Sequence, residues 1–344
     1  MKRLTIIGGG FAGAKAAKKL ENRFKITLID EKDYFEFTPG ILRSIVNPEH
    51  LDKIQVLHKD YLKNSGIIRD SVVKVKGKKV FLKKGKSLTF DYLIIASGSR
   101  YETPIKDRKT IIASRSKELK DYHKELEKNH DLILIGGGLV GVELAGEIAD
   151  YYPDKKVMII HSRNKLIQRN DKKSIKYAEK FLKRNGVKII YNERVEKKVD
   201  SHVVTEKGKK YKCDLVFFCT GIKPNSDFMD RKKLDQHGFI KVNKFLQMEG
   251  NKNVFVCGDI AGIKEEKTAQ GSEKQANHVV RNLFYLEQGK PMEKYRPRRR
   301  PMVISLGRWN GIFEYKKFVL TGIIPAFLKW FVEMKTMIRY KRPM

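Results

Sequence analysis

The chain has 344 residues, 41% of them hydrophobic, so it exceeds one ordinary domain and has ample material for two or three packed cores. Lys and Arg number 73 against 40 Asp and Glu, and the formal net charge of +33 suits anionic partners such as phosphate-bearing cofactors, acidic lipid or nucleic acid. Many of these lysines are scattered along the chain, so a generally cationic, solvated surface explains the excess equally well.

The first predicted elements form a βαβ unit around a glycine-rich turn. A short apolar strand over 4–7 leads into this turn at 8–13, and an Ala/Lys-rich helix and a strand over 25–29 follow. Gly8 permits the tight bend, Gly10 lets the backbone approach a pyrophosphate, and Gly13 allows close packing of helix on strand. Asp30 ends the second strand, where a carboxylate can hold a ribose hydroxyl. The unit predicts a dinucleotide site at a helix N-terminus.

Three apolar runs with glycine ends are predicted strands. The run 92–96 closes on Ser97-Gly98 and follows a charged, hairpin-like segment over 74–82. The run 215–219 closes on Thr220-Gly221, and the run 254–257 ends in Gly258-Asp259 before a predicted helix over 268–287.

A second βαβ unit repeats the first in kind. A strand over 132–135, a turn containing Gly136, Gly138 and Gly141, a helix through residue 149 and a strand over 157–160 follow one another. His161-Ser162-Arg163 stands where an acid would select NADH, and a cation there accommodates the 2′-phosphate of NADPH. We therefore expect NADPH, or both nucleotides, although Arg163 could simply belong to the Lys-rich surface.

The three cysteines, Cys213, Cys219 and Cys257, have no CxxC spacing and fall at or beside strand ends. They are predicted to be small buried thiols, with no disulfide framework and no metal site. The N-terminus runs straight into an apolar strand, Lys2 excludes N-myristoylation, and no apolar stretch approaches about 20 residues. We expect a cytoplasmic protein without a signal segment or a transmembrane helix.

The C-terminal segment is predicted to contain strands over 302–306 and 311–315 and a final helix. Residues 294–344 carry thirteen Lys and Arg against two Glu, a net charge of +11. In the helix an apolar stripe opposes a polar face, with Trp330 near the border. The stripe comprises Phe327, Leu328, Phe331, Met334 and Ile338, and the polar face comprises Lys329, Glu333 and Thr336. Such a helix can lie peripherally on an anionic membrane, at its inner face, or it can pack its stripe against the first domain.

The paired turns, Ala96-Ser97-Gly98, Thr220-Gly221 and Gly258-Asp259 resemble the FAD/NAD(P)-dependent pyridine nucleotide-disulfide reductase superfamily. The resemblance implies an α/β fold with two Rossmann-like, three-layer (β-β-α) dinucleotide-binding domains, the second inserted in the first, plus a smaller C-terminal α+β segment. The boundaries implied are 1–113 and 223–294 for the FAD domain, 114–222 for the NAD(P)H domain and 295–344 for the C-terminal segment.

The resemblance also implies the residues that bind the two cofactors, FAD and either NADH or NADPH. FAD contacts are expected at Gly8, Gly10, Phe11, Ala12, Gly13, Asp30, Arg43, Val72, Ser97, Gly98, Gly258, Asp259 and Ala269. Contacts with the nicotinamide nucleotide are expected at Gly136, Gly138, Leu139, Val140, Gly141, His161, Ser162, Arg163 and Gly221.

The segment 31–60 contains no cysteine, whereas disulfide reductases commonly carry their redox pair there. Leu42-Arg43, Gly141-Val142-Glu143, 160–162, 219–223, 305–308 and 335–337 are instead similar to the branch with type II NADH dehydrogenases, apoptosis-inducing factor and ferroptosis suppressors. That branch implies an NAD(P)H:quinone oxidoreductase, in which hydride passes to flavin N5 and two electrons then reduce a quinone.

Three residues are expected to take part in this chemistry. Glu143 matches an acid near the nicotinamide and the flavin, although it could be an ordinary carboxylate at a helix N-terminus. Gln275 belongs to the helix after Asp259, although the spacing of Gln270 and Gln275 is not the usual one, and Lys335 could donate a proton to reduced quinone or simply be a surface lysine.

Other activities stay open. A ferredoxin or rubredoxin reductase is the alternative within the enzyme class, and a nucleic-acid-binding flavoprotein resembling apoptosis-inducing factor is the alternative outside it. Nonspecific nucleic-acid binding is expected as a by-product of the positive charge. The oligomeric state, monomer or homodimer, does not follow from the sequence.

Overall fold

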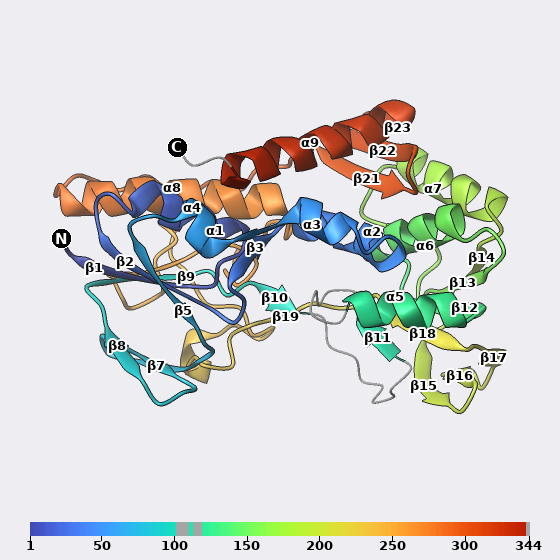
Figure 1. Ribbon diagram of the computed structural model, residues 1–344, viewed down its shortest axis with the longest axis horizontal. Helices are drawn as coiled ribbons and strands as arrows, with labels where there is room; N and C mark the ends of the chain where they lie inside the picture. Colours follow the sequence, from blue (N-terminus) through green and yellow to red (C-terminus); the bar gives the residue numbers. More distant parts are fainter. Residues whose placement is uncertain (101–109, 113–118, 342–344) are drawn as a thin grey trace.

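A computed structural model describes residues 1–100, 110–112 and 119–341 as two α/β halves with a C-terminal layer above them (Figure 1). The first half is built on a parallel five-stranded sheet of order β20-β9-β1-β2-β5. Its strands are β1 (Arg3–Ile7), β2 (Lys25–Asp30), β5 (Ser65–Arg69), β9 (Tyr92–Ile95) and β20 (Val254–Val256).

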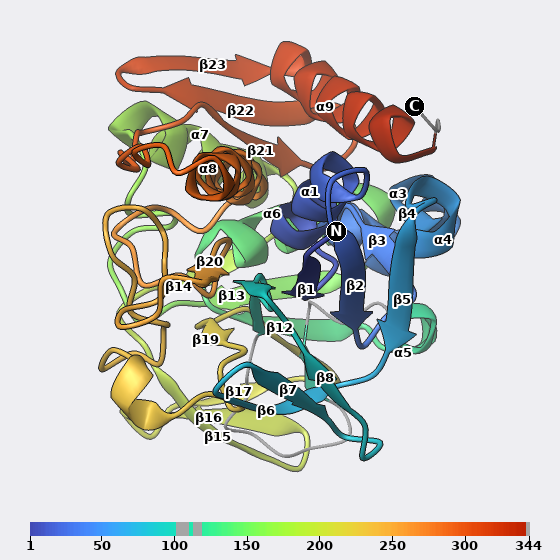
Figure 2. The same cartoon turned by 90° about the vertical axis from the view of Figure 1, so that its left-hand side faces the viewer.

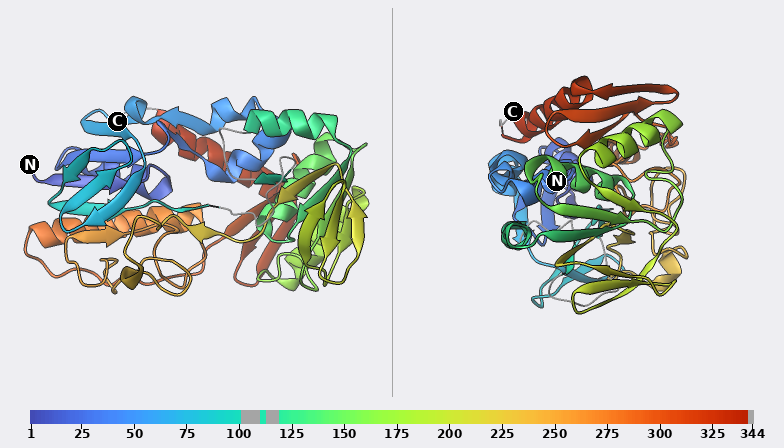
Figure 3. Two further views of the ribbon diagram at one scale, coloured as in Figure 1. Left: turned by 90° about the horizontal axis from the view of Figure 1, so that it is seen from below. Right: turned by 90° about the vertical axis from the view of Figure 1, so that its right-hand side faces the viewer.

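The second half repeats this plan with a parallel sheet of order β11-β18-β12-β13-β14. Its strands are β11 (Thr110–Ile112), β12 (Asp131–Ile135), β13 (Lys156–Ile160), β14 (Lys188–Ile190) and β18 (Leu215–Phe218). Figure 3 shows the two halves at opposite ends of the molecule. The expected pair of Rossmann-like units is therefore confirmed.

The strands of the first sheet are buried on both faces, which explains their continuous apolar sequences. Leu4 and Ile6 pack with helices on one face, whereas Ile7 joins Val80 and Leu82 of an antiparallel sheet on the other. This sheet and its counterpart in the second half complete the three layers in each unit. They comprise β6 (Val72–Lys76), β7 (Lys79–Leu82) and β8 (Ser87–Thr89), and β15 (Val195–Val199), β16 (His202–Thr205) and β17 (Lys210–Lys212).

The helices include the two that follow the glycine turns, α1 and α6. The long helix α8 packs against α1, and its N-cap Thr268 accepts a hydrogen bond from the backbone N–H of Gly271. The helices are α1 (Phe11–Leu20), α2 (Ile41–Val46), α3 (His50–Ile54), α4 (His58–Tyr61), α5 (Leu119–Lys128), α6 (Leu139–Tyr151), α7 (Lys172–Arg184), α8 (Ala269–Glu287) and α9 (Ile323–Lys341). Short 3₁₀ segments are η1 (Thr38–Gly40) and η3 (Arg231–Lys233).

Two short strand pairs complete the inventory of the halves. β3 (Tyr34–Glu36) pairs with β4 (Gln55–Leu57), and β10 (Ser99–Arg100) pairs with β19 (Lys223–Pro224) where the chain crosses between the halves. The first crossing precedes β11, which pairs with β18 in the second sheet. The strand Thr110–Ile112 therefore belongs to the second half, although the implied boundary at 113 put it in the first.

The C-terminal layer contains one strand more than the sequence predicted. β21 (Met302–Leu306), β22 (Asn310–Tyr315) and β23 (Phe318–Gly322) form an antiparallel sheet, and α9 packs on it. Figure 2 shows this layer lying above α1, α6 and α8. The sequence pattern missed this strand because β23 ends at Gly322 and α9 begins at the next residue, with no loop between them.

Tyr340, near the end of α9, anchors the helix to the first half. Its ring is fully buried, stacks on Phe35 with centroids 4.1 Å apart, and meets the edge of Tyr61 at 5.0 Å. Its hydroxyl is buried without a hydrogen-bond partner among the described residues. The ring thus contributes packing, whereas the hydroxyl carries a desolvation cost.

The Tyr340 ring and its hydroxyl are expected to have opposite effects on stability. Tyr340→Phe should raise the free energy of unfolding by about 1 kcal/mol, because a buried, unpaired hydroxyl is removed. Tyr340→Ala should lower it by about 3–5 kcal/mol through loss of the ring. Chemical denaturation measures both changes. A Tyr340→Phe protein less stable than wild type would show that the hydroxyl has a partner.

Candidate functional site

The first glycine turn has the geometry of a phosphate-binding turn. Gly8 has a φ of +95°, where other residues are strained, and a Cβ there would collide with the backbone carbonyl of Ala96. A Cβ at Gly13 would collide with the carbonyl oxygen of Gly8, whereas a Cβ at Gly10 would meet no atom of the described residues within 4 Å. The turn is closed on its strand side and open beside the N-terminus of α1, so a pyrophosphate fits there.

Asp30 is fixed at the end of β2 beside this turn. Its Oδ2 accepts a hydrogen bond from the backbone N–H of Gly9 at 2.5 Å, and Oδ1 accepts one from that of Lys32 at 2.9 Å. Burial alone would raise the pKa of Asp30, but His58, with Nε2 3.6 Å from Oδ2, and Lys32 lower it below its usual value. A charged carboxylate therefore faces the place expected for the ribose.

The second turn repeats this geometry with a different residue at the strand end. Gly136 has a φ of +111°, and a Cβ at Gly138 would again meet no atom of the described residues within 4 Å. His161 takes the position of Asp30, because its Nδ1 accepts a hydrogen bond from the backbone N–H of Gly137 at 3.1 Å. Burial lowers the pKa of His161, so its ring is neutral at neutral pH. The second site thus lacks the negative charge of the first.

Arg163 provides a positive charge beside the second turn. With the amide of Gln168 turned to satisfy its hydrogen bonds, its oxygen accepts from both Nε and Nη1 of Arg163, at 3.1 Å each. Arg163 and Ser162 are both exposed to solvent. The contact with Gln168 fixes the orientation of the Arg163 guanidinium, which can then bind a phosphate group.

Asp259 and Gln275 occupy the entrance to α8. Asp259 accepts hydrogen bonds from the hydroxyls of Ser99 at 3.0 Å and Ser272 at 3.4 Å, while burial raises its pKa. The amide oxygen of Gln275 accepts from the backbone N–H of Gly258 at 2.8 Å, and its NH₂ donates to Glu265 at 3.0 Å. Gln275 therefore supports the Gly258 turn, with both ends of its amide engaged.

The other residues expected at the FAD site lie around these turns. Phe11 and Ala12 are the first residues of α1, and Ala269 is the first of α8. The Ser97 hydroxyl donates to the backbone carbonyl of Asn225 at 2.8 Å. Val72 lies at the start of β6, and Gly98 follows β9. Of the residues expected at the nicotinamide nucleotide, Leu139 and Val140 begin α6 and Gly221 follows β18.

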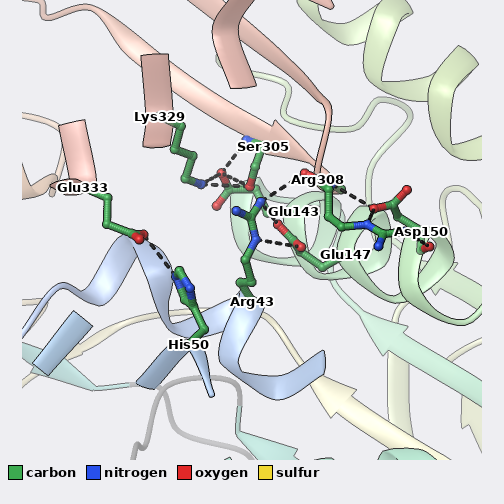
Figure 4. A network of polar contacts seen from close by, with 10 residues as sticks. Arg43, His50, Glu143, Glu147, Asp150, Ser305, Arg308, Lys329 and Glu333 are labelled. Carbon is green, nitrogen blue, oxygen red and sulfur yellow. Dashed lines mark hydrogen bonds and ion pairs between the residues drawn. The ribbon is translucent and has the colours of Figure 1, made fainter. Parts of the chain in front are cut away.

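Glu143, on α6, is held by two groups of the C-terminal layer. Its Oε1 accepts hydrogen bonds from the Lys329 ammonium at 2.5 Å and from the backbone N–H of Ser305 at 2.8 Å. Lys329 also donates to the Ser305 hydroxyl at 2.9 Å (Figure 4). Lys335, the lysine expected to act on reduced quinone, is exposed on α9. The structure therefore brings Lys329, not Lys335, to Glu143.

Two further carboxylates of α6 are paired one and two turns beyond Glu143. Glu147 is buried and binds Arg43 through both oxygens, at 2.9 and 3.2 Å, while Arg43 also donates to the carbonyl of Gly307. Asp150 accepts hydrogen bonds from the backbone and the guanidinium of Arg308, each at 2.9 Å. Arg43, expected at FAD, thus also joins α2 to α6.

A small pocket with about 20 Å³ of enclosed space, open to solvent, lies between α2, α3, α6, β21 and α9. His50 and Glu333 line it, with Nε2 and Oε2 3.2 Å apart. Its lining comprises Pro39, Gly40, Leu42, Arg43, His50, Glu147, Ser305, Gly307, Ala326, Lys329, Trp330 and Glu333. Sequence reasoning missed His50, Lys329 and Glu333 as site residues. The one available signal was that Lys329 and Glu333 are a helical turn apart.

The cysteines are not arranged as a redox pair. Cys213, Cys219 and Cys257 are all free and buried, and burial raises the pKa of Cys219 and of Cys257 to about 12. The thiols of Cys219 and Cys257 therefore stay protonated and unreactive at neutral pH. Over residues 1–100, 110–112 and 119–341, no group of three or more His, Cys, Asp or Glu is placed to hold a metal ion.

Two parallel sheets, each with a phosphate-binding turn and a helix N-terminus, define a two-dinucleotide oxidoreductase. The family model described as pyridine nucleotide-disulphide oxidoreductase matches residues 2–278, and the chain belongs to this family. The protein is an FAD-dependent NAD(P)H oxidoreductase. The open spaces at Gly10 and Gly138 fit its two cofactors.

Several known proteins are similar over nearly the whole chain. Ferroptosis suppressor protein 1 of Taeniopygia guttata is 32% identical, covering 95% of this chain and 92% of its own. Apoptosis-inducing factor homolog B of Dictyostelium discoideum is 31% identical, covering 93% and 91%.

Solved structures share the fold. The sulfide:quinone oxidoreductase of Aquifex aeolicus has a TM-score of 0.87 at 20% identity, covering 99% of this chain and 92% of its own. NDH2 of Plasmodium falciparum, in complex with NADH, has a TM-score of 0.82 at 15% identity, covering 99% of each chain.

The neutral His161 and the clamped Arg163 predict that NADPH binds more tightly than NADH. Arg163→Gln should weaken NADP⁺ binding about tenfold to hundredfold, because a charge-assisted hydrogen bond contributes ~1.5–3 kcal/mol, and leave NAD⁺ binding unchanged. Isothermal titration calorimetry of the FAD-loaded protein measures both constants. Arg184→Gln, an exposed arginine on α7, is the matched control. Tighter binding of NADH by wild type would contradict the prediction.

Proposed function

We propose that the protein is an NAD(P)H:quinone oxidoreductase that transfers two electrons per turnover without a redox disulfide. The observation that carries the proposal is the polar pocket beside Glu143, because Trp330, which lines it, is also part of the exposed apolar surface of α9. A quinone has a polar ring and an apolar tail, so it matches both surfaces. The curated relatives named ferroptosis suppressor protein 1 and the NDH2 fold support the same class of reaction.

Each residue of the site has a defined task in this reaction. The turns at Gly10 and Gly138 bind the pyrophosphates of FAD and NAD(P)H and so orient the two ring systems. FAD, when bound, supplies the electron transfer between the nicotinamide and the acceptor. Glu143 and Lys329 form a fixed, hydrogen-bonded ion pair at the start of α6, where they present a cation to the reacting groups. Gln275 holds Gly258 in place and so positions Asp259.

The proposal predicts two separate half-reactions. Anaerobic addition of NAD(P)H to purified protein should bleach the flavin absorption, and a short-chain ubiquinone or menaquinone should restore it. Lys329→Met should slow the restoration about tenfold to hundredfold, because a positioned cation is lost, and Lys335→Met should not. A wild-type flavin that is restored by ferredoxin or rubredoxin, but not by either quinone, would contradict the proposal and favour an iron–sulfur acceptor.

The solvent-facing side of α9 is apolar and its protein-facing side is polar, the reverse of an ordinary amphipathic helix. Phe327, Trp330 and Phe331 are 51%, 55% and 49% exposed, whereas Glu333 and Thr336 are buried. The apolar stripe thus does not pack on the first domain, which was the alternative interpretation. Other exposed apolar side chains near it are Trp309, Phe318, Ile323, Ile324, Leu328, Val332 and Ile338.

We propose that this face docks on an anionic membrane surface, such as an inner leaflet. No helix among the described residues is long and apolar enough to cross a bilayer. Exposed cations flank the apolar side chains on the same layer, at Arg308, Lys316, Lys317, Lys335 and Lys341. Cations near acidic headgroups contribute about 1 kcal/mol each, and the aromatic rings fit the interface. Docking there would place the pocket next to lipid-soluble quinone.

Replacing Phe327 and Phe331 together by Asp should reduce sedimentation with phosphatidylserine/phosphatidylcholine vesicles at least tenfold. The reason is that burying each phenylalanine ring in the bilayer contributes about 1.5–3 kcal/mol to the free energy of binding, which the aspartates remove. Val199→Asp, an equally exposed apolar position in the second half, is the control and should sediment as wild type does.

Two outcomes would contradict membrane docking. Equal vesicle binding by the double variant and wild type would remove the apolar face from the interaction. Self-association of wild type in the absence of lipid, abolished by the same double substitution, would show that a second copy of the chain covers this face. Analytical ultracentrifugation separates the latter case.

A further inference from the structure

Reduction of a quinone needs a proton that the nicotinamide does not supply. One NAD(P)H, one quinone and one proton give one NAD(P)⁺ and one hydroquinone, so two electrons and one proton come from the nicotinamide and the second proton comes from the medium. Within a protein pocket a side chain transfers such a proton most efficiently. We propose that His50 and Glu333 hold this proton between Nε2 and Oε2 and give it to the acceptor oxygen. This inference rests on the proposed quinone reduction.

The pair is built into the pocket from two distant parts of the chain. His50 begins α3 and is 5% exposed, and Glu333, on α9, is 8% exposed. Their nitrogen and oxygen are 3.2 Å apart (Figure 4). Gly40 leaves room for the contact, because a Cβ there would lie 2.9 Å from Glu333 Oε2 and 3.3 Å from His50 Nε2. The pair faces the pocket lined by Arg43 and Lys329.

The charges around the pocket balance only with this proton in place. Arg43 from α2 and Lys329 from α9 give two positive charges. Glu143 and Glu147 from α6, together with Glu333, give three negative charges. The η1 and β21 residues that line the pocket, Pro39, Gly40 and Ser305, carry no charge, and Asp52 and Lys53 of α3 are exposed. Delivery of the proton leaves one uncompensated, buried carboxylate, which favours uptake of another proton from water.

The other cations around the pocket are poorer donors. Arg43 does not release a proton in proteins and is occupied by Glu147. Lys329 holds Glu143 and Ser305 in place, so deprotonation would remove the contact that joins α9 to α6. The imidazole of His50 can accept a proton at a ring nitrogen and give it up again, and its Nε2 lies 3.2 Å from Oε2 of Glu333 in the pocket.

The test separates proton-dependent from proton-independent acceptors. His50→Gln and Glu333→Gln, loaded with FAD, are reduced by NAD(P)H and then mixed with either a short-chain quinone or ferricyanide, which takes electrons alone. The quinone step should slow about a hundredfold in both variants, the loss typical of one general acid, while reduction by NAD(P)H and the ferricyanide step keep wild-type rates. His123→Gln is the control, because His123 forms a similar pair with Glu127 on α5, outside the pocket.

A second readout follows the imidazole itself. In ¹⁵N-histidine spectra of the oxidised holoprotein, the signal missing from His50→Gln should change protonation over the same pH range as the quinone step. Wild-type quinone rates in both variants, equal losses with ferricyanide, or a His50 signal that does not change in that range would overturn the inference. If His50→Gln does not retain FAD, the inference is judged from the quinone and ferricyanide rates of Glu333→Gln, which is nearly isosteric with wild type. A wild-type protein that no quinone reoxidises would overturn the proposed function as well.

Discussion

The acidic side of α6 is the constraint on which the arrangement of the molecule depends. Three carboxylates, about one helical turn apart, each meet a cation that another part of the chain supplies. They are Glu143 with Lys329, Glu147 with Arg43, and Asp150 with Arg308. These pairs join α6 of the second half to α2 of the first half, and to α9 and the turn after β21 in the C-terminal layer. Removal of Arg43 would leave the buried Glu147 as an unpaired charge at a high energetic cost, so this contact in particular fixes α2 against α6.

The cofactor turns could be predicted from the sequence because their physics is local. Gly8, Gly10 and Gly13 lie within six residues, and a strand and a helix that the apolar pattern identifies flank them. Asp30 follows at a characteristic distance along the chain. The same reasoning located the second turn. The backbone N–H of Gly9 donates to Asp30, and that of Gly137 donates to His161, so these two strand-end residues occupy equivalent positions in the two halves.

The acceptor side of the site could not be predicted in this way, because its residues are brought together over long distances. His50 and Glu333 are separated by 283 positions, and Lys329 and Glu143 by 186. No spacing in the sequence encodes such a contact. Helical periodicity correctly separated an apolar from a polar side of α9. The polar side would ordinarily face solvent, but here it faces the protein and the apolar side faces solvent. Glu143 on α6 pairs with Lys329, and His50 on α3 pairs with Glu333, so the polar side packs inward without leaving these charges unpaired.

This reversal also links the two proposed surfaces of α9. Lys329 and Glu333 point inward while Phe327 and Phe331 point outward, because residues four apart share a helix face and residues two apart do not. A rotation of the helix that buried the apolar side chains would carry both charged groups out of the pocket. The ion pair with Glu143 and the stacked Tyr340 oppose such a rotation from the two ends of the helix. The same contacts that assemble the pocket therefore keep the apolar face exposed, and neither surface can change without the other.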